Sequence, residues 1–536
     1  MTLRGGLAAG AGALAAAAVL LAACKQGPDF LSPAPPEEKA YTADDDPTLP
    51  SADEPPSKRG PAQRVALGAK VEDDWWNLFH SPILNRVIKQ ALVDSPSIAQ
   101  ATATLAQARE QVVAVAGTAL PQVDLQAGLA REQFNPAPSG VNRTPVPVSV
   151  YSIGPSVTYA LDVFGGIKRQ IEGQAARADV SDNQLAAAYL TLTGNIANQA
   201  ITIAGLRAQI KTVQNIIADD ERNLGLVKAQ QAGGTATMVD VTSAQSQLAN
   251  DRTLLPPLGQ QLSVARDALT AFAGRVPADW SAPDFDLADL TLPKIVPLSL
   301  PSALVRQRPD ILAAEAQLHV AATDVGVATA NLYPNFTLNA NVLQSATIPG
   351  NIFSGTFTAF NIGAEMAAPI FHGGTLTAQQ RAAKHAFDAS WAAYRQTVIT
   401  SFSQVADLLH ALQHDDEAVK TQRAAVAATA QALKLARLSY TAGNTTLLQL
   451  LDPERLMQQA QLGLVKAETQ RLIDSAALMV ALGSGWWNTP PTVPTVETLE
   501  QRTVPVSPTA YPAPASVLPP EGPDDSGPFW TKWFSP

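Results

Sequence analysis

The chain has 536 residues, a length that allows two or more domains or one elongated architecture. Charged residues make up 16% of it and the net charge is −10, with no basic cluster, so the composition argues against a nucleic-acid partner. A single cysteine excludes an intrachain disulfide framework, and the fold must therefore depend on packing alone.

The first residues predict a secretory signal peptide. Arg4 is a short positive segment, and the run from Gly5 to Ala23 is apolar, made mostly of small residues, and ends at Cys24. The closing "LAAC" resembles a bacterial lipobox, in which the cysteine becomes the lipidated first residue of the mature protein. Lys25 follows it, in place of the aspartate that retains a lipoprotein in the inner membrane. The resemblance implies export, a covalent lipid on Cys24 and an outer-membrane address; an uncleaved anchor beside an incidental thiol is the alternative.

An internal duplication fills most of the rest. "SPSIAQATATLAQAREQVVAVAGTALPQVDLQAGL" at 95–129 matches "RPDILAAEAQLHVAATDVGVATANLYPNFTLNANV" at 308–342, and Gly234 pairs with Gly443. The repeated unit is about 210 residues long, which is too long for a solenoid repeat. The predicted division is a signal peptide at 1–23, a lipidated Pro-rich acidic linker at 24–70, a segment at 71–94, a first structural repeat at 95–274, a linker at 275–307, a second repeat at 308–483, and a segment with a Pro-rich tail at 484–536.

Each copy predicts the same order of elements. A helix without breakers comes first, at 97–116 and 310–332. Polar and apolar residues then alternate, which predicts strands, at 123–129, 151–163, 336–342 and 360–366. Very long helices follow, at 167–232 and from Thr375 to Ala442, and each ends at a glycine turn from which a second helix returns. A 66-residue helix would be about 100 Å long, so lateral packing against other long helices must stabilise it. In the first copy "LPPLGQQL" (254 to 262, with the preceding leucine) must break the returning helix.

Alternating strands of this kind are typical of a transmembrane barrel, because an open sheet edge cannot face lipid. Four strands cannot close a barrel, and the smallest common one has about eight. The barrel must therefore be assembled from several chains. A soluble, one-sided sheet packed on helices is the alternative.

Five features together resemble the TolC/OprM-like outer-membrane efflux proteins, in particular their lipidated NodT-like branch. These markers are "LAAC", "DDWWNLFHSPILNRVIKQAL", the duplicated unit, "LPPLGQQL" and the "AGN…LLQLLDPER" turn, and the resemblance covers about residues 20 to 486. It implies a mixed α and β membrane protein. Three chains would form a twelve-stranded transmembrane β-barrel, with four strands from each, continued by a long periplasmic α-helical barrel and an equatorial domain. The resemblance makes the segment at 71–94, the linker at 275–307 and the segment at 484–536 equatorial.

The resemblance also implies the function. The chain would be the outer-membrane exit duct of a tripartite efflux system for small toxic molecules or drugs. Its partners would be two further copies in a homotrimer, a periplasmic adaptor and an inner-membrane transporter of RND type. No enzymatic activity, no metal and no cofactor other than the lipid on Cys24 are expected. A duct for type I protein secretion or heavy-metal efflux is an alternative, and a periplasmic coiled-coil adaptor or scaffold is an alternative of another class.

The family closes its tunnel at the periplasmic tip, and its residues carry over position by position. The constriction corresponds to Leu448, Asp452 and Arg455, while Gln449 stands where some members have an aspartate. The network that holds neighbouring helices in the closed state corresponds to Asp240 and Tyr440. Three copies of Asp452 around a narrow axis would favour cations; a carboxylate that merely stabilises a helix start is the alternative.

Three further positions complete the predicted site. Gly234 and Gly443 match tip positions that adaptors contact. Pro453 departs from the usual alanine and could stiffen the turn or displace Arg455. His410 and His414 have a spacing that can hold a metal, but the sequence offers no evident third ligand, so no metal site is predicted.

Overall fold

The computed structural model describes residues 27, 29–38, 40–42, 63–69, 71, 74–133, 144, 146–354 and 358–483. The chain divides into two compact units, residues 1–491 and 492–536, and the whole second unit lies outside the described ranges. The predicted signal peptide, the lipidation site at Cys24 and the Pro-rich tail also lie outside the described residues.

The elements of the first unit follow the predicted order twice. In the first copy they are α3 (Pro96–Gly117), β2 (Gln122–Glu132), β3 (Val148–Leu161), α4 (Gly166–Ala232), α5 (Met238–Arg252) and α6 (Leu255–Phe272). In the second they are α8 (Pro309–Ala330), β5 (Asn335–Ala346), β6 (Thr358–Ala367), α9 (Thr375–Thr441) and α10 (Leu447–Ala481). The predicted helices and all four strands are confirmed, because breaker-free runs and alternating polarity are local signals that need no distant partner.

The four strands form one antiparallel sheet in the order β2-β3-β5-β6. β3 pairs with β2 on one side and with β5 on the other, so the sheet joins the two copies at its centre. Each outer strand, β2 and β6, has one neighbour within the described part of the chain. Every residue of both outer strands is exposed, including the apolar side chains of Val123, Leu125 and Leu129. Within one chain the sheet therefore has two open edges and an uncovered apolar face.

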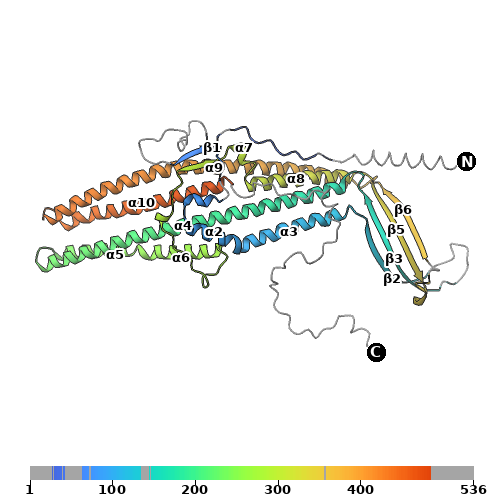
Figure 1. Ribbon diagram of the computed structural model, residues 1–536, viewed down its shortest axis with the longest axis horizontal. Coiled ribbons are helices and arrows are strands. Elements are labelled where there is room, and N and C mark those ends of the chain that lie inside the picture. Colours follow the sequence, from blue (N-terminus) through green and yellow to red (C-terminus); the bar gives the residue numbers. More distant parts are fainter. Residues whose placement is uncertain are drawn as a thin grey trace, which may run out of the picture. The chain divides into compact units, whose positions relative to one another are not determined.

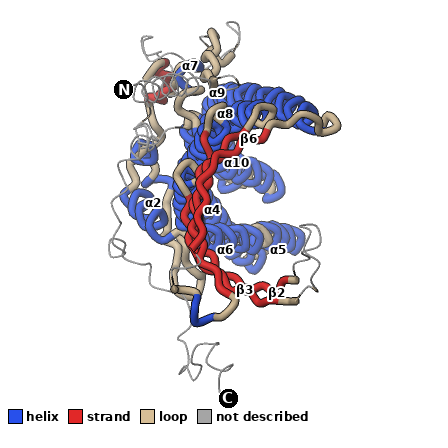
Figure 2. The backbone as a smooth tube through the Cα atoms, turned by 90° about the vertical axis from the view of Figure 1, so that its right-hand side faces the viewer, coloured by secondary structure: helices blue, strands red, loops and turns tan. Residues whose placement is uncertain are grey.

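The helices pack lengthwise beside one another. α4 contacts α8, α3, α10, α6 and α5, and α9 contacts α10 and α8. The helical turns lie at the end of this layer remote from the sheet (Figure 1), as the length of the 67-residue α4 requires. Viewed from the sheet end, α8 and α9 lie on one side and α5 and α6 on the other, with α4 and α10 between them (Figure 2). No helix in the described ranges has the length and apolarity needed to cross a bilayer.

Close contact between α4 and α10 depends on a glycine. A β-carbon built on Gly205 of α4 would lie 2.4 Å from Thr469 Cγ2 of α10, well inside van der Waals contact. Small residues at such positions let two helix backbones approach, and larger ones would force them apart.

The predicted interruption of the first returning helix is confirmed. α5 ends at Arg252, and α6 begins at Leu255, so that Pro256 and Pro257 occupy its first turn. Proline is accepted there because the first amide hydrogens of a helix have no partner within the helix. The second copy has no corresponding break, and α10 runs without interruption through Pro453.

Shorter elements surround the middle of the long helices. They are β1 (Arg64–Leu67), η1 (Trp75–Phe79), α2 (Pro82–Asp94), η3 (Leu287–Asp289), β4 (Ile295–Leu298) and α7 (Pro301–Leu304). One further short helix, η4 (Pro349–Asn351), lies apart from them in the loop between β5 and β6. Trp75, Trp76 and Phe79 are buried in the same apolar core as the central part of α4, so both tryptophans act as packing anchors. β1 and β4 form a parallel pair that the sequence did not predict, because strands of four residues carry almost no periodicity.

The segment 29–38 lies against α4 and α8. Asp29 Oδ1 is 3.0 Å from a guanidinium nitrogen of Arg169, which is buried, and the ring of Phe30 stacks on His319 with centroids 4.4 Å apart. Further along, Arg306 donates to the backbone oxygen of Pro33 over 2.7 Å. These contacts attach segment 29–38 to the start of α4, to α8 and to the residues just before α8.

Candidate functional site at the helical tips

Both helical hairpins end in the same turn. Gly234 and Gly443 have φ angles of 76° and 74°, in the left-handed region that favours glycine. The residue after each glycine donates its backbone N–H to a carbonyl five residues back, Thr235 to Gln230 over 2.8 Å and Asn444 to Ser439 over 2.9 Å. The identical geometry explains why the two tip sequences resemble each other across the duplication.

The returning helices also begin in the same way. The backbone N–H of Thr237 donates to Asp240 Oδ2 over 2.8 Å, and the N–H of Thr446 donates to Gln449 Oε1 over 3.1 Å. Both pairs are capping boxes, in which the third helical residue reaches back to the residue before the helix. The hydrogen bonds that Asp240 accepts from the backbone and side chain of Thr237 lower its pKa below the ordinary value. Two predicted gate residues, Asp240 and Gln449, thus act as helix caps within one chain.

An apolar cluster joins the two hairpins immediately behind the turns. Its buried members come from α4, α5 and α10: Val227, Val241, Ala244, Leu447 and Leu450. Tyr440 of α9 packs on this cluster, and its hydroxyl donates to Gln230 Oε1 of α4 over 2.7 Å. Partial burial, followed by the charge of Asp240, raises the pKa of Tyr440. Tyr440 therefore connects the second hairpin to the first within one chain.

The predicted constriction residues occupy one face of α10. Leu448, Asp452 and Arg455 follow the spacing i, i+4, i+7, which aligns side chains along a helix, and all three are exposed. Leu447 and Leu450, on another face of α10, belong to the apolar cluster and are each 2% exposed. The packing of the two hairpins thus decides that the face carrying Asp452 stays uncovered in one chain.

Asp452 is paired within its own helix. Its Oδ1 lies 2.8 Å from a guanidinium nitrogen of Arg455, three residues further on. Pro453 lies inside α10, where it supplies no N–H to the carbonyl four residues back, yet the helix continues on both sides. The proline therefore leaves Arg455 next to Asp452. An exposed pair of this kind contributes about 0–1 kcal/mol.

A buried polar layer, which no sequence pattern predicted, lies behind the apolar cluster. Glu454 of α10 is 5% exposed, accepts from Asn223 Nδ2 of α4 over 3.0 Å and lies 3.2 Å from Arg437 of α9. Burial raises the pKa of Glu454, and the hydrogen bond and charge of Arg437 oppose this rise. A glutamate in a helix normally indicates a solvated face, so only the packing of three helices reveals this one as internal.

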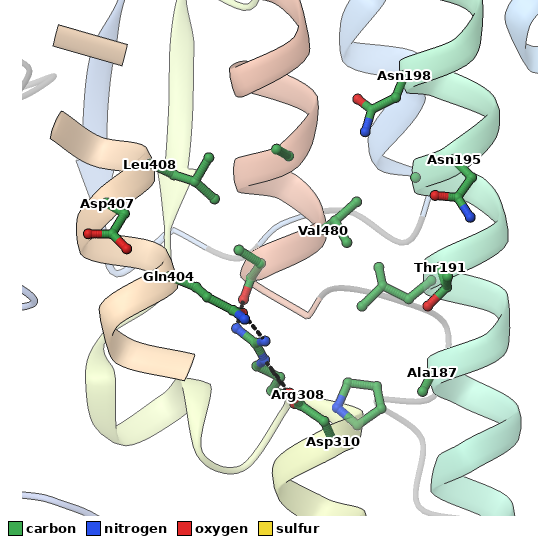
Figure 3. Close-up of a pocket in the computed structure, with 15 residues that line it drawn as sticks. Ala187, Thr191, Asn195, Asn198, Arg308, Asp310, Gln404, Asp407, Leu408 and Val480 are labelled. Carbon is green, nitrogen blue, oxygen red and sulfur yellow. Dashed lines mark hydrogen bonds and ion pairs between the residues drawn. The ribbon is translucent and has the colours of Figure 1, made fainter. Parts of the chain in front are cut away.

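A second feature is a pocket of about 460 Å³ among the helices, near the start of α8 and the end of α10. Thr191, Asn195 and Asn198 of α4 face it from one side, and Gln404, Asp407 and Leu408 of α9 from the other (Figure 3). Arg308 lies between them and donates to Asp310, at 2.8 Å, to Gln404 and to the backbone oxygen of Ala481, at 2.9 Å. Because these acceptors surround the guanidinium, it fastens three helices together rather than offering a free charge.

The described residues contain no group of three or more His, Cys, Asp or Glu side chains that could hold a metal ion. The tips and the pocket among the helices likewise present no arrangement of a nucleophile with a base beside it among the described contacts. The tip presents carboxylate, guanidinium and apolar side chains at the end of the long helices.

Comparison with known proteins decides the family. The family model described as "Outer membrane efflux protein" matches residues 87–275 and 300–484, which together are more than half of the chain. The chain belongs to the outer membrane efflux protein family. The predicted resemblance and the mixed helix-and-sheet fold class of trimeric channels are confirmed, and the chain is an outer-membrane efflux channel that extends into the periplasm.

Individual relatives agree. The pyoverdine export outer membrane protein OpmQ of Pseudomonas aeruginosa is 30% identical over 416 residues, covering 77% of this chain and 87% of the relative. The probable efflux pump outer membrane protein TtgC of Pseudomonas putida is 28% identical over 481 residues, covering 88% and 95%. The solved structure of the outer-membrane channel OprN has a TM-score of 0.76 and 27% identity, covering 86% of this chain and all of that one.

This family consists of transport channels that act as trimers with an adaptor and an inner-membrane pump. The scaffold alternative is therefore set aside, since the efflux channels supply the match over both copies of the repeat. The roles of the individual tip residues and the boundaries of the predicted segments remain predictions.

Proposed function

We propose that the chain is the exit duct of a tripartite efflux system for small toxic molecules or drugs, closed at the helical tips. The observation that supports this gate is the exposed face of α10, where Leu448, Asp452 and Arg455 lie in line beyond a buried apolar cluster. In a trimer, three such faces would meet at the axis. Each would bring one carboxylate and one apolar side chain to the narrowest point.

The closed state would be held by contacts of modest strength. The Tyr440–Gln230 hydrogen bond joins the two hairpins and is partly exposed, so it contributes of order 1 kcal/mol. The exposed Asp452–Arg455 pair lies within one helix and fixes only the position of these two side chains. Contacts of that size can be displaced by a partner that binds the open arrangement only a few kcal/mol more tightly. Asp240 and Gln449 would contribute by fixing the first turns of α5 and α10 as helix caps.

The partner that displaces them would be a periplasmic adaptor. Gly234 and Gly443 lie in turns where no atom stands within 4 Å of a built β-carbon, so the tips are accessible to another protein. We propose that the adaptor contacts these turns and joins the duct to an inner-membrane transporter of RND type. A lipid on Cys24 would hold the N-terminus at the outer membrane, close to the sheet end of the helices where Asp29 meets Arg169.

Single-channel conductance of the purified trimer in a planar bilayer tests the gate, with Asp452→Ala as the variant. Asp388→Ala, which removes an exposed carboxylate from α9, is the matched control. We expect a small, cation-selective conductance in the wild type and the control. In Asp452→Ala we expect a larger conductance, lower selectivity, or both.

The outcomes separate the parts of the proposal. Equal conductance and selectivity in wild type and Asp452→Ala would remove the gate from this face while leaving the duct in place. Absence of conductance in a trimer that is correctly inserted would contradict the duct itself. Transport assays with drugs, metal ions and a secreted protein substrate would then distinguish drug efflux from the two other kinds of cargo.

A further inference from the structure

Two carboxyl groups meet inside the first hairpin, about three helical turns behind its tip. Asp220 of α4 and Asp251 of α5 are 5% and 6% exposed. Oδ2 of Asp251 accepts from Gln247 Nε2 over 2.8 Å and from Gln458 Nε2 of α10 over 3.3 Å. Both side-chain amides therefore donate to the same oxygen of Asp251.

Asp220 has no such donor. Its Oδ2 is buried and lacks a hydrogen-bond partner among the described residues, although the Asp251 carboxyl group is close enough to share a hydrogen bond with Asp220. A buried carboxylate without a donor costs several kcal/mol. Two ionised carboxylates facing each other cannot supply the missing hydrogen, since each is only an acceptor.

The other charged groups around the pair do not supply a hydrogen-bond donor to Asp220. Asp219 on α4 and Glu454 on α10 are acidic and add to the negative field at Asp220. Arg437 of α9 is the nearest cation of this layer, and it is engaged by Glu454 at 3.2 Å and by Asp219 at 4.0 Å. Arg252, next to Asp251, pairs with the exposed Glu221 over 2.6 Å. None of these groups supplies a hydrogen to Asp220 Oδ2 within the described part of the chain.

We propose that Asp220 and Asp251 bind one proton between them, and that this shared proton holds the end of α5 against α4 and α10 behind the tip. The proton comes from solvent, and the O–H of one carboxyl group then donates to an oxygen of the other. The pair carries one negative charge with the proton bound and two without it. No covalent bond of the chain changes.

The position of Asp251 in α5 means that loss of the proton would affect the packing of this helix. Asp251 lies in the last turn of α5, directly before the break at Thr253 and Leu254 where α6 begins. A negative charge is unfavourable at a helix C-terminus, and the break allows α5 to move as a separate element. Loss of the proton would leave two like charges in a poorly solvated site, which would push α5 away from α4.

The direction of the pH dependence follows. Burial first, and then Asp251, Glu454 and Asp219, raise the pKa of Asp220 to about 8. An acid whose pKa is raised in the folded state stabilises packing at pH values below its unfolded pKa, and this contribution is lost as the pH rises through the folded value. The shared proton is thus present at neutral pH and leaves above about pH 8.

Isotope-edited infrared spectroscopy of the full-length trimer with labelled aspartate tests the proton directly. The difference between wild type and Asp220→Asn should contain a protonated-carboxyl band that disappears with a midpoint near pH 8. Taking this difference cancels the contribution of other protonated aspartates. In Asp251→Asn the midpoint should fall, because an amide hydrogen would then stabilise the ionised form of Asp220.

The consequence for transport rests on the proposed gate, and conductance measured as a function of pH tests it. The wild type should conduct more as the pH rises through about 8, whereas Asp220→Asn should show no such step. Asp267→Asn, an exposed aspartate on α6, should keep the wild-type step.

Absence of the protonated band at neutral pH would overturn the proposal whatever the channel does. A band with the expected midpoint in a channel whose conductance does not depend on pH would overturn the mechanical part. If the inserted trimer conducts at no pH, the proposed duct fails, and the infrared result still supports or contradicts the shared proton.

Discussion

Tyr440 of α9 donates its hydroxyl hydrogen to Gln230 Oε1 of α4 over 2.7 Å, and this bond links the two helical hairpins at their tips. The residues lie 210 positions apart in the chain. Each belongs to the last turns of a 67-residue helix that starts at the sheet, so the bond fixes the spacing of two helix ends about 100 Å from where the helices begin.

We expect Tyr440→Phe to loosen the tip without unfolding the protein. The substitution removes one partly exposed hydrogen bond, worth about 0.5–1.5 kcal/mol, and keeps the ring in the apolar cluster. Conductance should rise while the melting temperature changes little. A double-mutant cycle with Gln230→Ala should give a coupling energy of about 1 kcal/mol, and strictly additive effects of the two substitutions would show that the bond does not hold the tip.

A second prediction concerns a different group of charged side chains between α9 and α10, formed by Asp415, Asp474 and Arg471. Burial, followed by the hydrogen bond and charge of Asp474, raises the pKa of Asp415 to about 7, although Arg471 opposes this rise. Because the raised pKa belongs to an acid, its stabilising contribution is lost as the pH rises through about 7. In Asp415→Asn the group stays neutral, so the melting temperature should fall less than in wild type over this range.

The neighbouring residue provides the contrast. Asp416 lies 3.0 Å from the buried guanidinium of Arg471 and also pairs with Lys420. Asp416→Asn leaves a buried cation without its closest counter-charge, and removing one partner of a buried pair costs about 3–5 kcal/mol. This variant should melt lower at every pH. A pH profile of Asp415→Asn that parallels wild type would contradict the assignment to Asp415.

A third prediction uses two glycines of α4. Gly205→Ala should destabilise the chain by about 1–3 kcal/mol, because the new methyl group would lie 2.4 Å from Thr469 of α10. Gly225→Ala should be neutral or stabilising by up to about 1 kcal/mol, since no atom stands within 4 Å of its built β-carbon and alanine favours helix. Thermal unfolding of both variants checks the pair. Equal effects would mean that α4 and α10 do not pack as closely as described.

A fourth prediction concerns the segment 29–38. Arg169 is 1% exposed and binds Asp29 at 3.0 Å and Glu172 at 2.9 Å, so Arg169→Ala should release this segment from α4. Limited proteolysis should then cleave it faster than in wild type. Arg177→Ala removes a half-exposed pair with Asp324 and a hydrogen bond to Gln174 of the same helix, neither of which involves segment 29–38, and should leave the cleavage rate unchanged. Equal protection of the segment in Arg169→Ala and wild type would show that other contacts hold it.

Local sequence patterns were sufficient to predict the elements, their order and the turns at the tips. Alternating polarity, breaker-free runs and glycine turns act through neighbours in the chain, so they retain their meaning without knowledge of the fold. For the same reason the capping partners of Thr237 and Thr446, three residues away, are visible in the sequence. The duplication made each observation in one copy a check on the other.

Which side chains are buried depends on how the helices pack against one another. Asp220, Asp251 and Glu454 are ordinary helical carboxyl groups in the sequence, and they become a buried layer because α4, α5, α9 and α10 pack around them. Similarly, the uncovered face of α10 at Leu448 and Asp452 follows from which of its residues the first hairpin covers. Burial and the pKa shifts that it causes depend on atoms about 200 residues away along the chain, and no local pattern records them.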